Sequence, residues 1–197
     1  DITDEKKVKL ISKKIGLNRI DILINNAAND YKPKSNKKKL NFENFDINQW
    51  NKDLMVGLGG AFICTKVFGS LMAKRKRGVI LNISSDLGII APDQTLYEGL
   101  KFKKPVTYSV VKHGLNGLTK YTASYWANKN IRCNAIAPGG IFNNQNNKFL
   151  NKVKKVIPMK RLAKKNEYND LILFLCSNSS SYMTGSIVVA DGGRTII

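Results

Sequence analysis

The sequence predicts an α/β domain built around one parallel β-sheet. Short apolar runs rich in β-branched residues alternate with helical patterns along the chain of 197 residues. Each run is continuously apolar, which is typical of strands that are buried on both faces of a parallel sheet. The chain has no internal repeat and no low-complexity linker, so we expect a single domain with helices on both faces of the sheet.

The order of the elements supports this fold class. Apolar runs predict four strands, at residues 20–25, 78–85, 131–138 and 186–193. Apolar residues at helical spacing predict helices between these strands. The helices are expected at residues 3–16, about 47–74 and about 106–129, with two short ones in the polar stretch after Gly140, the second at 166–177.

The composition favours a solvated basic surface over a specific nucleic-acid site. The net charge is +19, but only six of the 33 basic residues are Arg, and the Lys residues are scattered among Asn residues. Arg is the residue that grips phosphate through two parallel hydrogen bonds, so a phosphate-reading face would contain more of it. Three Lys clusters, at 31–39, 101–104 and 152–165, are expected near a substrate cleft.

Targeting signals and cysteines indicate a cytoplasmic protein. No apolar run approaches the roughly 20 residues that cross a membrane, and the first ten residues lack the apolar core of a signal peptide. Cys64, Cys133 and Cys176 lie in apolar runs without CxxC spacing, which predicts reduced, buried thiols. We therefore expect no membrane partner and no bound metal.

Small and polar residues follow three of the predicted strands. Asn25 to Ala28 follow the first strand, Ser84 and Ser85 end the second, and Pro138 to Gly140 close the third. The carboxyl ends of parallel strands meet at one edge of the sheet, where such folds bind their ligands. These residues are therefore expected to surround one site.

Tyr108 and Lys112 open the helix between the second and third strands. Residues four apart project from the same face of a helix. A fixed ammonium group beside a phenol favours the phenolate and lowers the pKa of the tyrosine from its reference value of roughly 10. The pair is therefore a candidate for acid–base chemistry at this edge of the sheet.

Together these motifs resemble the short-chain dehydrogenase/reductase family over essentially the whole sequence. The matching segments are "ILINNAA", "LNISS", "YSVVK", "RCNAIAPGG" and "YMTGSIVVADGG". The resemblance implies a Rossmann-type doubly wound parallel sheet, and interconversion of a carbonyl and an alcohol by hydride transfer with NAD or NADP. It implies that Tyr108 transfers the proton, that Lys112 lowers the tyrosine pKa and holds the nicotinamide ribose, and that Ser85 hydrogen-bonds the substrate oxygen.

The same resemblance implies a set of cofactor-binding residues. These residues are Asp1, Ile2, Asn26, Ala27, Tyr108, Lys112, Gly139 and Ile141. The first two would contact adenine, the next two the adenosine ribose, and the last two the nicotinamide. His113 points away from Lys112 by roughly 100° around the helix, so we expect its side chain to lie on the surface or to contribute to packing.

The sequence departs from the family pattern in three places. It lacks the glycine-rich turn and begins after the first two βα units, on the order of 60 residues, so residues 1–197 resemble the C-terminal portion of a single NAD(P)-binding Rossmann domain. We expect the chain to be inactive without those units. Gly57 stands where family members commonly have a catalytic Asn that holds a water beside the Lys. Ala28 and Asn143 replace a Gly and a Thr, and both replacements are expected to be tolerated.

The segment between Ser85 and Tyr108 is longer than the usual spacing in the family. Its length and the sequences "APDQTLY" and "KPVTYSVVKHG" are similar to reductases associated with flagellin or surface-sugar modification. We therefore expect substrate loops at about 86–105 and 141–165, and a large anionic small-molecule substrate of the sugar type, such as a sugar phosphate or nucleotide sugar, that the nearby lysines attract. Two alternatives remain. One is a 3-oxoacyl-carrier-protein reductase, whose acidic partner would suit the basic surface, and the other is a truncated, non-catalytic remnant.

The two long helices, at about 47–74 and 106–129, carry more apolar surface than one sheet face needs. Members of the family that the sequence resembles commonly pair these helices between subunits. We therefore expect a homodimer or homotetramer.

Overall fold

The computed structural model describes residues 1–16, 20–29, 41–99 and 103–197. Its sheet has four parallel strands in the order β1-β2-β3-β4, which confirms the predicted α/β class. The last strand ends at residue 190 instead of 193, because Gly192 and Gly193 turn the chain with φ of 69° and 87°. The strands are β1 (Ile22–Asn25), β2 (Gly78–Ile83), β3 (Ile131–Pro138) and β4 (Ile187–Ala190).

Helices precede or follow each strand, as predicted. Two π-helical turns, Met55–Gly59 and Thr65–Gly69, join three of the helical segments into one continuous helix over Ile47–Arg75, where the sequence predicted a helix at about 47–74. The α-helical segments are α1 (Glu5–Ile15), α2 (Ile47–Leu54), α3 (Gly60–Cys64), α4 (Ser70–Arg75), α5 (Val106–Trp126), α6 (Asn147–Val156) and α7 (Asn169–Cys176).

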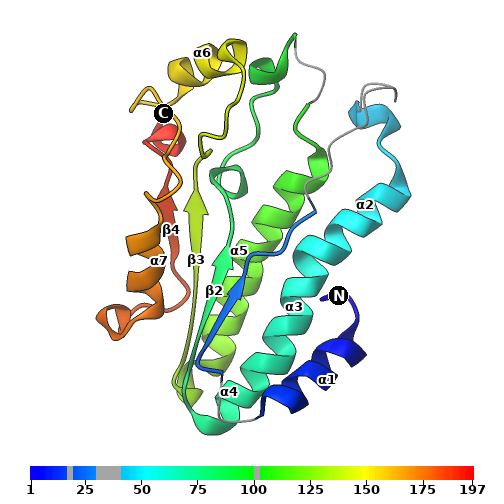
Figure 1. Ribbon diagram of the computed structural model, residues 1–197, viewed down its shortest axis with the longest axis vertical. Coiled ribbons are helices and arrows are strands. Elements are labelled where there is room, and N and C mark those ends of the chain that lie inside the picture. Colours follow the sequence, from blue (N-terminus) through cyan, green and yellow to red (C-terminus); the bar gives the residue numbers. More distant parts are fainter. Residues whose placement is uncertain (17–19, 30–40, 100–102) are drawn as a thin grey trace.

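The helices lie on two sides of the sheet (Figure 1). On one face, Met72 of α4 packs against Ile80 of β2 and Cys133 of β3, and α1, α3 and α5 lie on the same side. On the other face, Leu175 of α7 packs against Leu81 of β2 and against β3 and β4. Burial of this apolar surface on both faces is what stabilises a parallel sheet.

The described residues cover only one face of the strand β1. Leu23 packs against the buried clusters beneath α1 and α4. Ile22 and Ile24 point to the opposite face, because side chains alternate along a strand, and they are 46% and 45% exposed. The helix α7 packs over β2, β3 and β4 and leaves this face of β1 uncovered. Among the described residues, helices therefore cover both faces of β2 and β3, whereas β1 and β4 at the edges of the sheet are covered on one face, and Val189 on the other face of β4 is 40% exposed.

Buried amides connect the strands to the helices. Asn25 Nδ2 donates to Asn82 Oδ1 at 2.8 Å and to Thr65 Oγ1 at 3.0 Å, and Asn82 Nδ2 donates to Thr119 Oγ1 at 2.8 Å. Asn82 and Thr119 are completely buried, so these hydrogen bonds satisfy groups that would be costly to bury alone. Asn25, at the end of β1, therefore serves the packing of the strand.

The long helix over Ile47–Arg75 approaches α5 closely at two glycines. A Cβ atom on Gly57 would lie 2.6 Å from Val111 Cγ1, and one on Gly114 would lie 2.7 Å from Leu58 Cδ2. A larger residue at either position would force Val111 or Leu58 to move. Close packing therefore accounts for the glycine at position 57.

Among the described residues, the helix over Ile47–Arg75 is the one that is long and apolar enough to cross a membrane. In the fold, Ala61 of this helix packs against α5, Ile63 packs beneath α1, and Met72 packs on the sheet. Packing within the domain therefore accounts for its apolar character.

All three cysteines are free thiols, as predicted. Cys64 and Cys133 are buried, and Cys176 is half-buried. Burial raises the pKa of Cys133 to about 12, so this thiol is unreactive as a nucleophile.

Candidate active site

A cavity of about 400 Å³ opens at the carboxyl end of the sheet. Residues that follow β1, β2 and β3 line it, together with the start of α5, as expected for a site at this edge of a parallel sheet. The fold therefore brings six of the residues selected from the sequence to one place. They are Asn26, Ser85, Tyr108, Lys112, Gly139 and Ile141.

The two segments expected to form substrate loops contact each other at this cavity. The rings of Tyr97 and Phe149 of α6 have centroids 5.9 Å apart, and both residues line the cavity. Lys152 Nζ donates to the carbonyl oxygens of Thr95 at 2.6 Å and Glu98 at 3.0 Å. Parts of 86–105 and of 141–165 thus form a common wall.

Contacts between β2 and α5 hold Ser85 and Lys112 near each other. Ser84 Oγ donates to the Lys112 carbonyl oxygen at 3.1 Å, and Lys112 Nζ donates to the Ile83 carbonyl oxygen at 2.7 Å. Gly88 permits this approach, because a Cβ atom there would lie 3.0 Å from the Lys112 carbonyl oxygen. The end of β2 and the first turns of α5 are therefore fixed relative to each other.

Lys112 is a buried cation. Burial, and secondly the charge of Lys104, lower the pKa of Lys112 from 10.5 to about 8. Its Nζ lies 5.6 Å from the centre of the Tyr108 ring, and Lys104 Nζ lies 3.5 Å from the same centre. Two ammonium groups therefore flank the phenol ring, where the sequence pattern predicted one.

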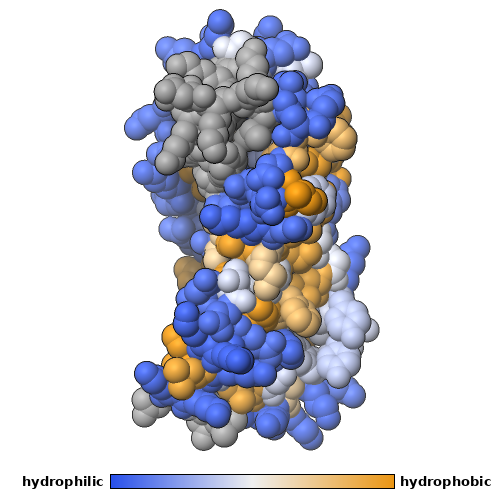
Figure 2. Space-filling model, turned by 90° about the vertical axis from the view of Figure 1, so that its right-hand side faces the viewer, coloured by the Kyte–Doolittle hydropathy of each residue, from blue (hydrophilic) through white to orange (hydrophobic). Residues whose placement is uncertain are grey.

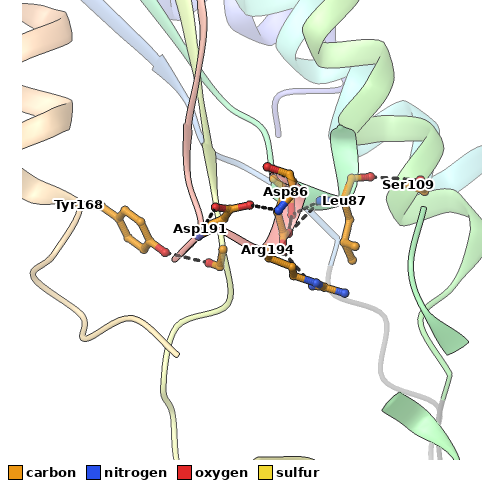
Figure 3. A network of polar contacts seen from close by, with 10 residues as sticks. Asp86, Leu87, Ser109, Tyr168, Asp191 and Arg194 are labelled. Atoms are coloured by element: carbon orange, nitrogen blue, oxygen red, sulfur yellow. Dashed lines mark hydrogen bonds and ion pairs between the residues drawn. The ribbon is translucent and has the colours of Figure 1, made fainter. Parts of the chain in front are cut away.

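Ser85 hydrogen-bonds to Asp86, a residue that the sequence analysis did not select. Ser85 Oγ donates to Asp86 Oδ1 at 2.7 Å and accepts a hydrogen bond from the Leu87 backbone N–H at 3.2 Å. Asp86 Oδ2 pairs with Arg194 Nη1 at 2.8 Å, and the two side chains are 4% and 12% exposed (Figure 3). The carboxylate thus connects the Ser85 hydroxyl to a guanidinium group near the end of the chain.

Tyr97 adds a second phenol to the cavity. It is 8% exposed, and burial raises the pKa of Tyr97 to about 12, so it stays protonated near neutral pH. No spacing rule relates residue 97 or residue 194 to the Tyr108–Lys112 pair. The one available signal was for Asp86, which directly follows the serines at the end of β2.

Asp53 is buried behind the first turn of α5. It is 5% exposed and accepts hydrogen bonds of 2.6 Å from the side chains of Asn29, Gln49 and Thr107. Thr107 precedes Tyr108 in the sequence. Asp53 therefore ties the start of α5 to the long helix at the point where the tyrosine projects.

Gly57 lies one turn after Asp53 on the same helix. Val111 occupies the space where a side chain at position 57 would begin. A cavity of about 30 Å³, large enough for a water molecule, is lined by Asp53, Gly57 and Lys112 among others. Among the described residues that line this small cavity, Asp53 is the one acidic side chain, and Gly57 stands where the family pattern has an Asn.

Other residues selected from the sequence do not line the large cavity. Asp1 is exposed at the start of the chain, and Ile2 packs into the cluster beneath α1. Ala27 is exposed after β1, and His113 is exposed on α5, as expected for a surface role. The Lys cluster at 31–39 lies outside the described residues.

Comparison with known proteins identifies the family. Residues 1–195 match the family profile described as Enoyl-(Acyl carrier protein) reductase. The crystal structure of a short chain dehydrogenase from Leptospira borgpetersenii serovar Hardjo-bovis (strain JB197), with bound NAD+, is 33% identical and has a TM-score of 0.88, covering 99% of this chain and 73% of that one. The chain belongs to the short-chain dehydrogenase/reductase family. The resemblance inferred from the motifs is thereby confirmed.

Curated members of the short-chain dehydrogenase/reductase family show similar identity. A 3-oxoacyl-(acyl-carrier-protein) reductase from Thermotoga maritima is 34% identical over 203 residues, covering 100% of this chain and 75% of the relative. The post-translational flagellin modification protein A from Campylobacter coli is 35% identical over 142 residues, covering 72% of this chain and 56% of the relative. The chain therefore spans between about half and three quarters of the length of these relatives.

Proposed function

We propose that this protein is an NAD- or NADP-dependent oxidoreductase that interconverts a carbonyl and an alcohol by hydride transfer, acting on an anionic, sugar-type substrate. One observation carries the proposal: Ser85, Tyr108 and Lys112 line a single cavity at the carboxyl end of the sheet. Membership of the short-chain dehydrogenase/reductase family supports the reaction class, and the relative with bound NAD+ supports the cofactor. A cytoplasmic location is part of the proposal.

In the proposed reduction, the substrate oxygen lies between Ser85 and Tyr108. Tyr108 gives its proton to this oxygen as the alkoxide forms, and Ser85 hydrogen-bonds the same oxygen. Lys112, cationic below its pKa of about 8, stabilises the phenolate that remains. Because the Ser85 hydroxyl donates to Asp86 in the structure, it turns its proton from Asp86 to the substrate when the substrate binds.

The chemistry of the cavity fits the nicotinamide end of the cofactor. The Lys112 ammonium uses one of its three donors on the Ile83 carbonyl oxygen, which leaves donors for ribose hydroxyls. Gly139 and Ile141 line the same cavity and offer backbone and apolar surface to a flat ring. When bound, the cofactor supplies or accepts the hydride.

The adenosine end of the cofactor is assigned to Asp1, Ile2, Asn26 and Ala27 as part of the proposal. Asn26 is the member of this set that lines the cavity. Within the described ranges, no three His, Cys, Asp or Glu side chains are grouped to hold a metal ion. We also propose that a polypeptide of residues 1–197 is inactive alone, because its sequence has no glycine-rich turn to hold the pyrophosphate of the cofactor, and turnover is therefore measured on a chain completed with such a turn.

The charges around the cavity support an anionic substrate. Lys104, Lys112 and Arg194 line it, and Asp86 is the one carboxylate among the described lining residues. An excess of positive charge in a cleft raises the local concentration of anions. The cavity therefore suits a substrate with a carboxylate or phosphate group, and parts of 86–105 and 141–165 are proposed to contact it.

A 3-oxoacyl-carrier-protein reductase is the second candidate. The relative from Thermotoga maritima carries this activity in its name, and Phe149, Val153 and Ile157 form an apolar wall that would suit an acyl chain. Comparing cofactor oxidation with acetoacetyl-coenzyme A and with 5-keto-D-gluconate separates the two candidates. Turnover of the thioester alone would favour the second candidate, and no turnover of any carbonyl would favour a non-catalytic remnant.

The test of the reaction is the substitution Tyr108→Phe, which removes only the hydroxyl that transfers the proton. We expect turnover to fall by about 100-fold or more while the melting temperature stays close to that of the wild type. Tyr121→Phe, on the exposed side of the same helix, is the control and should retain full activity. Undiminished turnover in Tyr108→Phe would remove this residue from the mechanism.

A further inference from the structure

Arg194 reaches the large cavity from the turn that follows β4 (Figure 3). Asp191 holds this turn on both sides of the arginine: its Oδ1 accepts from Gly193 N and its Oδ2 from Thr195 N, both at 2.8 Å. Gly192 and Gly193 adopt φ of 69° and 87°, a region that favours glycine. Because the backbone is held in this way and the side chain is 12% exposed, the guanidinium is in place before a ligand arrives.

The guanidinium of Arg194 has donors to spare. Nη1 donates to Asp86 Oδ2 at 2.8 Å. A guanidinium carries five N–H donors in a planar fork, and Nη2 and Nε donate to no other group in the described part of the chain. Neither nitrogen is among the fully buried atoms that lack a partner, so both remain accessible. This is the arrangement that binds a carboxylate or phosphate through two parallel hydrogen bonds.

Asp86 connects the same guanidinium to the reacting centre. Its Oδ1 accepts from Ser85 Oγ at 2.7 Å and from Leu87 N at 2.8 Å, while its Oδ2 accepts from Arg194. An ion pair buried to this degree contributes little to stability, because desolvation offsets the attraction between the charges. Stability alone therefore does not account for a charged pair at this position.

We propose that Arg194 binds the anionic group of the substrate, a carboxylate or a phosphate, and that Asp86 positions both Arg194 and Ser85. The inference rests on the proposed function for its assignment of the cavity to the substrate. Lys104 and Lys112 attract an anion as point charges, whereas the planar fork of Arg194 fixes its orientation. The anion then lies beside Asp86 and directs the carbonyl of the substrate toward Ser85 and Tyr108.

The test uses two probes that differ in one group. D-gluconate and D-glucitol share a six-carbon polyhydroxy chain, and gluconate has a carboxylate where glucitol has a hydroxymethyl group. Dissociation constants are measured by calorimetry, with the protein alone and with the nicotinamide cofactor present. We expect gluconate to bind at least about tenfold more tightly, as a charge-assisted contact predicts. Glucose 6-phosphate against glucose makes the same comparison for a phosphate group.

The first two variants either keep the guanidinium or remove it together with its counter-ion. Asp86→Asn keeps the guanidinium, and the double variant Asp86→Asn with Arg194→Gln removes it. We expect the preference for gluconate to persist in the first and to disappear in the second, with thermal melting showing that both are folded. Arg194→Lys keeps the ion pair and loses the fork, so its preference should fall severalfold. Arg77→Gln, which alters an arginine whose side chain is 76% exposed, should bind as the wild type does.

A folded double variant that still prefers gluconate would overturn the proposal, and so would a wild-type protein that binds both probes equally. If Lys104→Met lost the preference for gluconate while the double variant kept it, the anion would be assigned to Lys104. This result would also overturn the proposal. These readouts are independent of turnover. A protein that binds gluconate through Arg194 and reduces no carbonyl would contradict the proposed reaction and not the anion site.

Discussion

Lys112 is the residue whose charge should limit the pH range of the reaction. Its pKa is about 8, because burial disfavours the charged ammonium and Lys104 repels it. The cation is therefore present below about pH 8 and lost above it. Since the proposed mechanism needs a cation beside Tyr108, we expect the rate of carbonyl reduction to fall as the pH rises through about 8. The measurement is kcat as a function of pH at saturating substrate.

The control for this pH dependence is Lys112→Met, which has no charge at any pH. It should lose most of the activity, and its residual rate should show no decline near pH 8. A wild-type rate that stays constant to about pH 10 would contradict the assignment, because Lys112 is neutral there.

Asp53 should matter for stability as well as for turnover. In Asp53→Ala, the side chains of Asn29, Gln49 and Thr107 lose a shared acceptor in a buried site. We expect the free energy of unfolding to fall by about 2 kcal/mol or more. We also expect kcat/KM to fall, because Thr107 anchors the turn that carries Tyr108. Urea denaturation and steady-state kinetics measure the two effects.

The matched control for Asp53→Ala is Asp170→Ala, at an exposed carboxylate in the first turn of α7. It should change the free energy of unfolding by less than about 1 kcal/mol. Equal losses in the two variants would show that the buried hydrogen bonds of Asp53 add no particular stability.

At the scale of single residues, the sequence identified candidate functional residues that lie close together in the chain or beside a predicted strand. Tyr108 and Lys112 are one helical turn apart, and Ser85 closely follows a recognisable strand, so these residues could be selected without a structure. Asp86 and Arg194 could not be paired in this way, because they are 108 positions apart and only the docking of β4 brings them together. Tyr97 was missed because its burial depends on contact with α6.

At the scale of elements, the long helix over Ile47–Arg75 and α5 depend on glycine for their close approach. In Gly57→Ala, the new Cβ atom would lie 2.6 Å from Val111 Cγ1. Overpacking of this kind costs about 1–3 kcal/mol, partly offset by about 1 kcal/mol because Ala favours a helix over Gly. We therefore expect a lower melting temperature by calorimetry, and recovery in the double variant Gly57→Ala with Val111→Ala.

Gly117 is the control for this prediction. It lies in α5, and a Cβ atom there would have, apart from its chain neighbours and the nearby backbone of the helix itself, no atom of the described residues within 4 Å. Gly117→Ala should therefore stabilise the protein by up to about 1 kcal/mol. The packing argument fails if Gly57→Ala proves as stable as Gly117→Ala.

The strands and long helices were predictable because they are rich in apolar residues and because several of their boundaries carry glycine or proline, such as Gly78, Pro105 and Pro138. Two features of the elements were not predictable. The π-helical turns within the long helix are local changes in backbone hydrogen bonding, which the periodicity of apolar residues does not report. The exposed face of β1 depends on where α7 lies, and a run such as "IDILIN" reads the same whether one face or both are covered.

At the scale of the whole molecule, exposed apolar side chains predict self-association. Met55 and Phe62 on the long helix are 44% and 51% exposed, and Tyr121 and Tyr125 on α5 are 68% and 63% exposed. Figure 2 shows apolar surface in the middle of the face on the right-hand side of Figure 1. Homodimer interfaces are more apolar than ordinary surface. We therefore expect a homodimer or homotetramer in sedimentation at micromolar concentration.

The substitution Phe62→Arg tests this assembly, because it places a charge in the apolar surface of the long helix. It should shift the protein toward monomer. Leu173→Arg, at a residue of α7 that is 66% exposed, should leave the assembly unchanged. A wild-type protein that sediments only as a monomer would contradict the prediction.

The ion pair between Asp86 and Arg194 also has a consequence for biosynthesis. Asp86 leaves the ribosome 108 residues before its partner, so β1, β2 and α5 can associate while its carboxylate still lacks a counter-ion. Until β4 docks, the Ser85 hydroxyl lies beside a carboxylate whose charge no guanidinium offsets. Completion of the last strand therefore supplies the counter-ion of Asp86 and is the step that completes the site.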